Sequence, residues 1–269
     1  RIGDPRIFRL IKKWLRAGVS EEGEWSETKV GTPQGGVITL LANVCLHYVF
    51  DLWIEWLRRN RCCGDVIVVR YADDFVIGFQ HEHEAKACLE ELRARLAKFG
   101  LKLHDGKTRL IEFGRYAAQR REGRGEGRPE SFDFLGFTHV CQKTQKDGWF
   151  TIHRYTIAKR MRATLQAIKA KLRKRMHRPL GETGRWLKRV VQGWLNYHAV
   201  PSNSRRIRRF VDEVGRIWLR LIRRRSQRGR SRWTWERMCR LVRKHLPFPR
   251  IIHPYPHQRF HARLKARAV

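Results

Sequence analysis

The stretch DVIVVRYADDFVIGF, residues 65–79, decides the fold. Its first half, DVIVVRY, is rich in β-branched residues, which favour the extended backbone of a half-buried sheet. A second run of the same kind, FVIGF, follows after Ala72, Asp73 and Asp74. Two strands separated by so few residues pair antiparallel, and turn formers such as aspartate belong between them. The stretch therefore predicts a β-hairpin with Asp73 and Asp74 at its tip.

The paired aspartates allow two interpretations. Aspartate is a common turn former, so both residues could serve the turn alone. Adjacent carboxylates repel one another, however, and solvent alone gives them no gain. A divalent cation reverses that repulsion, because Mg²⁺ prefers hard carboxylate oxygens together with substrate phosphates. From the residues alone, the turn and the metal site both stay open.

Helical periodicity flanks the predicted hairpin. Apolar residues recur at helical spacing over residues 5–17, 37–58 and 81–99. Two further strands are expected near residues 101–104 and 107–113. The first 150 residues are thus expected to form an antiparallel sheet with helices, an α+β fold.

Charge is distributed unevenly along the chain. The 269 residues contain 59 Lys and Arg against 25 Asp and Glu, a formal net charge of +34. Residues 1–150 hold 25 Lys and Arg with 21 acids, whereas residues 151–269 hold 34 with only 4 acids, a net charge of +30. Ordinary surfaces mix both signs, so the second part is expected to bind a polyanion, most simply nucleic acid.

Composition excludes other classes of protein. A hydrophobic content of 42% is too high for a disordered basic tail. No apolar run reaches the roughly 18 to 20 residues that a membrane span needs, so no membrane partner is expected. The 6 cysteines include no C-x-x-C pair, which favours reduced thiols in a cytoplasmic compartment over a disulfide framework or a zinc site.

The second part predicts helices with a cationic surface. Helices are expected over residues 154–177 and 182–199, and a third begins near residues 201–202. The third has an apolar stripe, which is ordinary core, and its other faces carry Arg205, Arg206, Arg208, Arg209, Arg216, Arg220, Arg223 and Arg224. Since few acids are present to pair with them, these arginines are the predicted contacts to an RNA or RNA–DNA duplex, recognised by shape and phosphates.

Several segments resemble one known family and occur in that family's order. YADD (71–74), preceded by GTPQGG (31–36), resembles the palm of a reverse transcriptase. The details are similar to proteins encoded by group II introns, in LAN (41–43) with LH (46–47), LKLH (101–104) with KT (107–108), and FLGF (134–137). GWLNY (193–197) resembles the signature of their thumb, or maturase, domain.

The resemblance implies RNA-directed DNA polymerase chemistry. That family uses two Mg²⁺ ions to join a primer 3′-hydroxyl to an incoming nucleotide. By match to the motif, Asp73 and Asp74 are the implied catalytic, metal-binding residues. Tyr71 and Ala72 would lie beside the nucleotide and the primer end, and Gln34 would contact nucleotide or template. Lys107 would lie near the nucleotide's phosphates, with a solvated lysine in a turn as the alternative.

The resemblance also implies an organisation into three domains. Residues 1–150 would be a partial palm, residues 151–226 an all-α basic thumb or maturase domain, and residues 227–269 a basic, DNA-binding-like extension. The implied partners are intron RNA, an RNA template with its DNA primer, and target DNA, in a cytoplasmic ribonucleoprotein.

Two departures from the family pattern open an alternative function. Such palms carry another metal-binding aspartate upstream of the helix at residues 5–17, and no residue here matches it, so one Mg²⁺ site would be incomplete. The segment at residues 38–43 is one residue short of the family pattern. The alternative is therefore a catalytically inactive, RNA-binding maturase fragment or a decayed remnant, and the isolated 269 residues are expected to lack polymerase activity.

Overall fold

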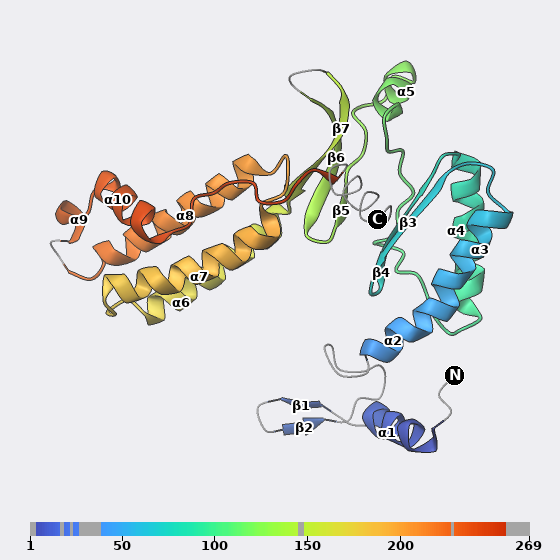
Figure 1. Ribbon diagram of the computed structural model, residues 1–269, viewed down its shortest axis with the longest axis horizontal. Coiled ribbons are helices and arrows are strands. Elements are labelled where there is room, and N and C mark those ends of the chain that lie inside the picture. Colours follow the sequence, from blue (N-terminus) through green and yellow to red (C-terminus); the bar gives the residue numbers. More distant parts are fainter. Residues whose placement is uncertain are drawn as a thin grey trace, which may run out of the picture. The chain divides into compact units, whose positions relative to one another are not determined.

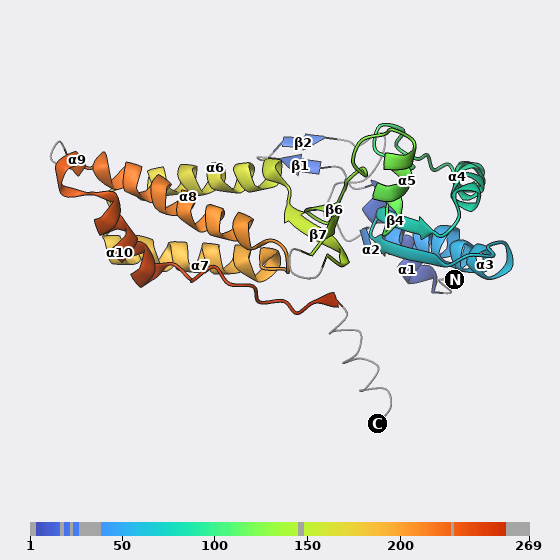
Figure 2. The ribbon, with the colours of Figure 1, turned by 90° about the horizontal axis from the view of Figure 1, so that it is seen from above.

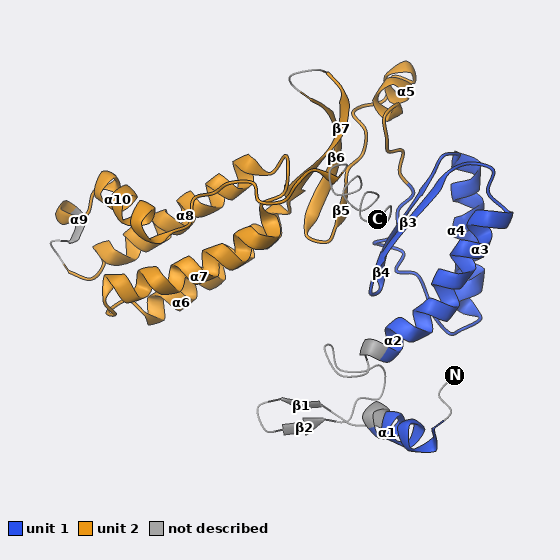
Figure 3. Cartoon of the chain, viewed as in Figure 1, with its two compact units in different colours: residues 1–110 blue, residues 111–269 orange. Residues whose placement is uncertain are grey.

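The computed structural model describes residues 4–16, 19–21, 24–26, 39–144, 148–226 and 229–256. The chain divides into two compact units, residues 1–110 and residues 111–269 (Figure 3). Both units contain helices and antiparallel strands, which confirms the predicted α+β class. The predicted limits at residues 150 and 226 concern functional domains and stay predictions.

The first unit alternates helices with two hairpins (Figure 1). Its elements are α1 (Pro5–Arg16), β1 (Val19–Glu21), β2 (Glu24–Ser26), α2 (Thr39–Leu46), the π-helical turn η1 (His47–Asp51), α3 (Leu52–Asn60), β3 (Val66–Tyr71), β4 (Asp74–Phe79) and α4 (Glu82–Ala97). The β3–β4 hairpin confirms the central prediction, and its register pairs Val66 with Phe79 and Tyr71 with Asp74.

One face of the β3–β4 hairpin rests on the core of the first unit. Side chains alternate along β3, so that Val66, Val68 and Arg70 point to the core side while Ile67, Val69 and Tyr71 are exposed. The Phe75 ring of β4 packs on Phe50 with centroids 4.6 Å apart. Buried residues of α3 and α4, including Ile54 and Leu92, complete this cluster. Helices therefore hold the hairpin from one side and leave its tip accessible.

The strands predicted over residues 101–104 and 107–113 are wrong. The structure has no regular strand there, and the chain turns at residues 105–107. The carbonyl of His104 accepts hydrogen bonds from the N–H groups of both Lys107 and Thr108, at 2.9 Å each. A strand needs a neighbouring ladder partner, and Asp105-Gly106 instead folds the segment back on itself.

The second unit joins a three-stranded sheet to a helical bundle (Figure 1). Its elements are α5 (Ala117–Gly123), β5 (Phe132–Phe134), β6 (Phe137–Lys143), β7 (Phe150–Thr156), α6 (Ala158–Lys174), α7 (Leu180–His198), α8 (Ser204–Arg223), α9 (Gly229–Arg232) and α10 (Trp235–His245). The sheet is antiparallel in the order β5-β6-β7. The helix predicted over residues 154–177 begins at Ala158, because β7 occupies residues 150–156 and pairs with β6.

The bundle is built around α8. Helix α8 packs on α6, α7 and α10 (Figures 1 and 2). In its apolar stripe, Phe210, Val214 and Trp218 are almost completely buried. The Trp194 ring of α7 stacks on Phe210 with centroids 3.6 Å apart. After α10 the chain runs back in an extended conformation along α7 (Figure 2). The apolar side of α8 is therefore buried in the core, and its polar side faces solvent.

Candidate functional site

The tip of the β3–β4 hairpin brings the predicted catalytic residues into solvent. Ala72 and Asp73 form the two-residue turn, and Ala72 lies in the left-handed region with φ +55°. Asp73 and Asp74 are both exposed, as is Tyr71 at 65%. A small side chain reduces the crowding of the left-handed conformation, and hairpin turns of two residues commonly require it. The turn thus presents two neighbouring carboxylates to whatever approaches from solvent.

Arg70 holds this tip from the core side of β3. Its Nη1 donates a 2.7 Å hydrogen bond to the carbonyl oxygen of Ala72. Its Nε and Nη2 bind the two carboxylate oxygens of Asp51 in a bidentate pair, each at 2.6 Å. Nη1 also donates to Asn43 Oδ1 at 3.1 Å. The strained turn is therefore tied to the end of the π turn and to α2 through one guanidinium.

The charge of this cluster is fixed by the same contacts. The Arg70 guanidinium holds the pKa of Asp51 below its ordinary value, against a smaller opposing effect of burial. Asp51 in turn raises the pKa of Arg70. The Arg70 side chain is only 16% exposed and Asp51 is 30% exposed, so solvent screens the pair incompletely. Both groups stay charged near neutral pH, and Arg70 stays a donor to Ala72.

Sequence reasoning missed Asp51, Arg70 and Asn43. The available signal was a charged residue at a position where the pattern expects an apolar one. Arg70 interrupts a β-branched strand on its core-facing side, and Asp51 stands in an apolar helical stretch. A buried charge normally has a partner. Which carboxylate partners Arg70 depended on a helix register that the periodicity did not show.

The other predicted nucleotide contacts are placed only in part. Lys107 is exposed in the turn after His104, and the described residues record no hydrogen bond between it and Asp73 or Asp74. Gln34 lies outside the described residues. Among the described side chains, no group of three or more His, Cys, Asp and Glu could hold a metal ion. Asp73 and Asp74 still fit Mg²⁺ as a partial donor set, since that ion binds through one or two carboxylates and keeps waters and substrate phosphates.

The predicted arginine surface lies along α8. Arg205, Arg208, Arg209, Arg216 and Arg220 are exposed, and at about 100° of rotation per residue all five lie within roughly 120° of the helix circumference, on one side. Asp212 shares that side. Most of the buried stripe lies on the other side, so the arginines form one band, which Asp212 interrupts.

Not all eight predicted arginines are equally available. Arg223 Nε donates to the carbonyl oxygen of Trp233 at 2.8 Å. The Arg216 guanidinium lies over the Trp235 ring, and Arg220 approaches Glu213 at 4.0 Å. The remaining arginines, for which the described residues record no ion pair, are Arg205, Arg206, Arg208, Arg209 and Arg224. Arg206 is half-buried, and the other four are exposed.

A polar junction fixes the sheet of the second unit to its helices. The buried Asn203 side chain accepts from the Thr156 N–H at 3.1 Å and donates to Thr156 Oγ1 and the His198 carbonyl, each at 2.8 Å. Burial, with a contribution from Arg160, lowers the pKa of His198 to about 4. The Tyr197 hydroxyl donates to the Leu135 carbonyl at 2.7 Å. Helix α7 is thereby held to both the β5–β6 turn and β7.

The described helices include none that is long and apolar enough to cross a membrane.

Known proteins resemble the chain over limited segments. Residues 2–139 match the family described as "Reverse transcriptase (RNA-dependent DNA polymerase)". The "Group II intron-encoded protein LtrA" of Lactococcus lactis subsp. cremoris is 46% identical over 65 residues, which cover 22% of this chain and 11% of LtrA. "Protein YkfC" of Escherichia coli (strain K12) is 30% identical over 138 residues, covering 41% of this chain and 36% of YkfC. An "Uncharacterized 91 kDa protein in cob intron" of Schizosaccharomyces pombe is 41% identical over 61 residues, covering 22% of this chain and 7% of that protein.

Proposed function

Because the chain belongs to the reverse transcriptase family, we propose that it is part of an RNA-directed DNA polymerase and intron RNA maturase of the group II intron type. The observation that carries the proposal is the hairpin tip, where Asp73 and Asp74 stand exposed on a turn tied down by Arg70. The similarity to LtrA supports the intron type. The chain spans 11% of the length of LtrA, so the activity proposed is that of the whole protein.

In this proposal Asp73 and Asp74 hold Mg²⁺ at the tip of the hairpin. The bound ions would lower the pKa of a primer 3′-hydroxyl and stabilise negative charge on the transferring phosphoryl group. Arg70 keeps the Ala72 carbonyl in place, so the turn offers its carboxylates in one fixed orientation. Tyr71 and Ala72 lie directly before them, where a nucleotide and primer end would sit, and Lys107 would contact phosphate.

The arginine band of α8 would hold the nucleic acid. Exposed guanidinium groups can contact the phosphates of a duplex without reading its sequence, and such binding weakens as salt rises. Intron RNA, an RNA template with its DNA primer, and target DNA are the proposed partners, within a ribonucleoprotein.

The catalytic assignment is tested with the protein expressed from its complete reading frame. Asp73→Asn should abolish Mg²⁺-dependent primer extension on an RNA template and leave RNA affinity within about twofold, because removing the charge takes away a metal ligand but no phosphate contact. Asp65→Asn is the matched control, since Asp65 is exposed at the opposite end of the hairpin. It should change neither activity nor affinity. Full extension by Asp73→Asn would show that the tip holds no essential metal.

The alternative function, RNA binding without polymerisation, is separated by the same assay. Residues 1–269 alone are expected to bind RNA and not extend a primer, because the resemblance implies a third metal-binding carboxylate besides Asp73 and Asp74. If the protein from the complete reading frame also fails to extend while binding RNA, the non-polymerising maturase is the correct function. Robust cDNA synthesis by residues 1–269 would show instead that the two aspartates suffice.

A further inference from the structure

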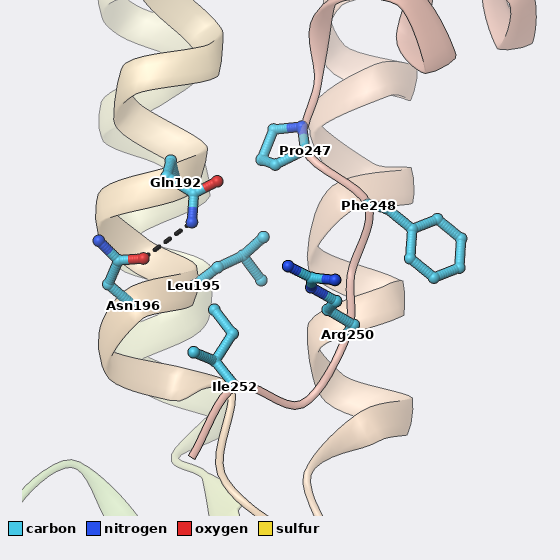
Figure 4. A pocket seen from close by; sticks show the side chains of 7 residues that line it. All are labelled: Gln192, Leu195, Asn196, Pro247, Phe248, Arg250 and Ile252. Atoms are coloured by element: carbon cyan, nitrogen blue, oxygen red, sulfur yellow. Dashed lines mark hydrogen bonds between the residues drawn. The ribbon is translucent and has the colours of Figure 1, made fainter.

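A cavity of about 460 Å³ lies on the second unit, between α7 and the segment that follows α10 (Figure 4). Gln192, Leu195 and Asn196 line it from α7, and Pro247, Arg250 and Ile252 line it from the segment. Its volume lies within the range of small-ligand sites, about 300 to 1,000 Å³. The cavity is far along the chain from the Asp73–Asp74 turn, and none of its residues belongs to the arginine band of α8.

Both ends of the lining segment are anchored. At the first end Leu246 is buried, and its N–H donates to the Val242 carbonyl at 2.7 Å. At the other end the N–H groups of Ile252 and His253 both donate to the carbonyl of Ala199, at 3.0 and 3.2 Å. The His253 ring also lies 2.6 Å from the Asn196 carbonyl through Nε2. The cavity is therefore formed before any ligand arrives, which lowers the cost of ordering the site on binding.

The walls of the cavity combine an apolar surface with one amide pair. Pro247 and Ile252 supply the accessible apolar part, whereas Leu195, only 1% exposed, belongs to the bundle core. Gln192 Nε2 donates to Asn196 Oδ1 at 2.8 Å, which leaves Gln192 Oε1 as an acceptor and Asn196 Nδ2 as a donor (Figure 4). The reversed amide orientation also leaves one acceptor and one donor side by side. The ligand that fits such walls has an apolar face and, along one edge, a hydrogen-bond donor next to an acceptor. A nucleobase has both features.

Positive charge lies at the cavity and on the preceding turns of α7. Arg250 is exposed, and in the described part of the chain it makes no recorded ion pair. Arg185, Lys188 and Arg189 are exposed on the turns of α7 that precede Gln192, at three- and four-residue intervals that continue its face. An anionic strand that enters the cavity would therefore meet cations along its backbone.

Phe248 adds an aromatic ring at the rim. Its side chain is 77% exposed and points away from the amide pair (Figure 4). An exposed ring beside a cationic groove is a stacking surface for a neighbouring base, and such stacking tolerates any sequence.

We propose that this cavity binds one unpaired nucleotide of a single strand. Its base lies on Pro247 and Ile252 with its edge on the Gln192–Asn196 pair, and its phosphate contacts Arg250. The proposal rests on the proposed function, in that the second unit binds nucleic acid, and it adds a site that recognises unpaired residues rather than duplex shape. The contacts address base and phosphate, so single-stranded RNA and DNA are the two sources to compare.

The test measures affinities of residues 1–269 by fluorescence anisotropy for three probes of equal length: single-stranded RNA, single-stranded DNA of the same sequence, and a blunt RNA duplex. The variant is Gln192→Ala with Asn196→Ala. Gln192 is half-buried and Asn196 is exposed, and their side chains are not in the bundle core, so the fold should be kept; far-UV circular dichroism checks this. Gln192→Met with Asn196→Leu provides a second, uncharged variant of similar volume. The matched control is Arg205→Ala with Arg209→Ala on α8.

We expect the amide variants to weaken single-strand binding roughly tenfold, as the loss of two hydrogen bonds predicts, and to leave duplex affinity within about twofold. The α8 control should weaken all three probes. Loss confined to RNA or to DNA identifies the natural strand. Unchanged single-strand affinity, or equal loss on the duplex, overturns the site while leaving the proposed function intact. Failure of the unaltered chain to bind any probe would instead overturn the proposed function.

Discussion

Replacing Arg70 with alanine should loosen the hairpin tip selectively. The substitution leaves the Asp51 carboxylate and the Asn43 amide without their guanidinium partner and releases the Ala72 carbonyl. Removing one member of a buried ion pair costs about 3–5 kcal/mol, and a charged hydrogen bond contributes about 1.5–3 kcal/mol. Because Asp51 is 30% exposed, water compensates part of the loss, and we expect a cost of about 2–3 kcal/mol.

Hydrogen exchange measured by mass spectrometry reports the loss of stability in the hairpin separately from the rest of the chain. A cost of about 2–3 kcal/mol corresponds to roughly 30- to 150-fold faster exchange of protected amides in residues 66–79, since each 1.4 kcal/mol is about tenfold. Peptides from α8 should exchange as before, because α8 belongs to the other compact unit.

Two further variants sharpen the experiment. Arg59→Ala removes an exposed ion pair with Glu55, where Arg59 is 72% exposed, and should change hairpin exchange less than about threefold. Arg70→Lys keeps the charge but cannot make the bidentate contact, so its exchange should fall between those of Arg70 and alanine. If Arg70→Ala leaves exchange of residues 66–79 within about threefold of the unaltered chain, Arg70 does not hold the turn.

Three other outcomes follow from the second unit. Asn203→Ala leaves the buried Thr156 N–H without its partner and should lower the stability of the unit by about 2–4 kcal/mol, measured by urea unfolding. Asn203→Asp should cost at least as much, because the buried carboxylate cannot donate to the His198 carbonyl. The folded pKa of His198 lies near 4, below its unfolded value, so the unfolded chain binds more protons than the folded chain between those two values. The melting temperature should therefore fall as the pH drops from about 6.5 toward 4. His198→Gln should flatten that decline, and an unchanged slope would contradict the assignment. RNA affinity should fall linearly with log salt concentration, and Arg205→Ala or Arg209→Ala should each reduce the slope by about 1; a flat salt dependence would remove the α8 band from the interface.

Local signals made the β3–β4 hairpin and the helix of residues 82–97 predictable. In the hairpin, strand propensity, turn residues and short separation all agree. The strands expected over residues 101–113 failed because pairing depends on a partner elsewhere in the chain, which local sequence does not reveal. β7 was missed for the same reason, since its partner β6 makes a strand of residues that lead directly into α6.

In the candidate site, too, the features that depend on local sequence were predictable and those that depend on distant contacts were not. The exposed aspartates at the tip were predicted because the turn chemistry is contained in four residues. The support for that turn was not, because Arg70 lies 19 residues from Asp51 and 27 from Asn43 in the sequence. The arginine band of α8 was predictable from helical period, while its internal contacts, such as Arg223 with the Trp233 carbonyl, required the tertiary structure.

The π turn at His47–Asp51 determines how the side chains before it and after it are oriented around the helix axis. In an unbroken α-helix, the steps from Asn43 to Asp51 would turn through about 800°, which leaves the two side chains roughly 80° apart around the axis. A π turn takes up one extra residue, so the difference shrinks to about 20° and both side chains reach one guanidinium. The local winding of a helix thus acts as an alignment device, and deleting a single residue from it would point Asn43 and Asp51 in different directions without altering any side chain of the site.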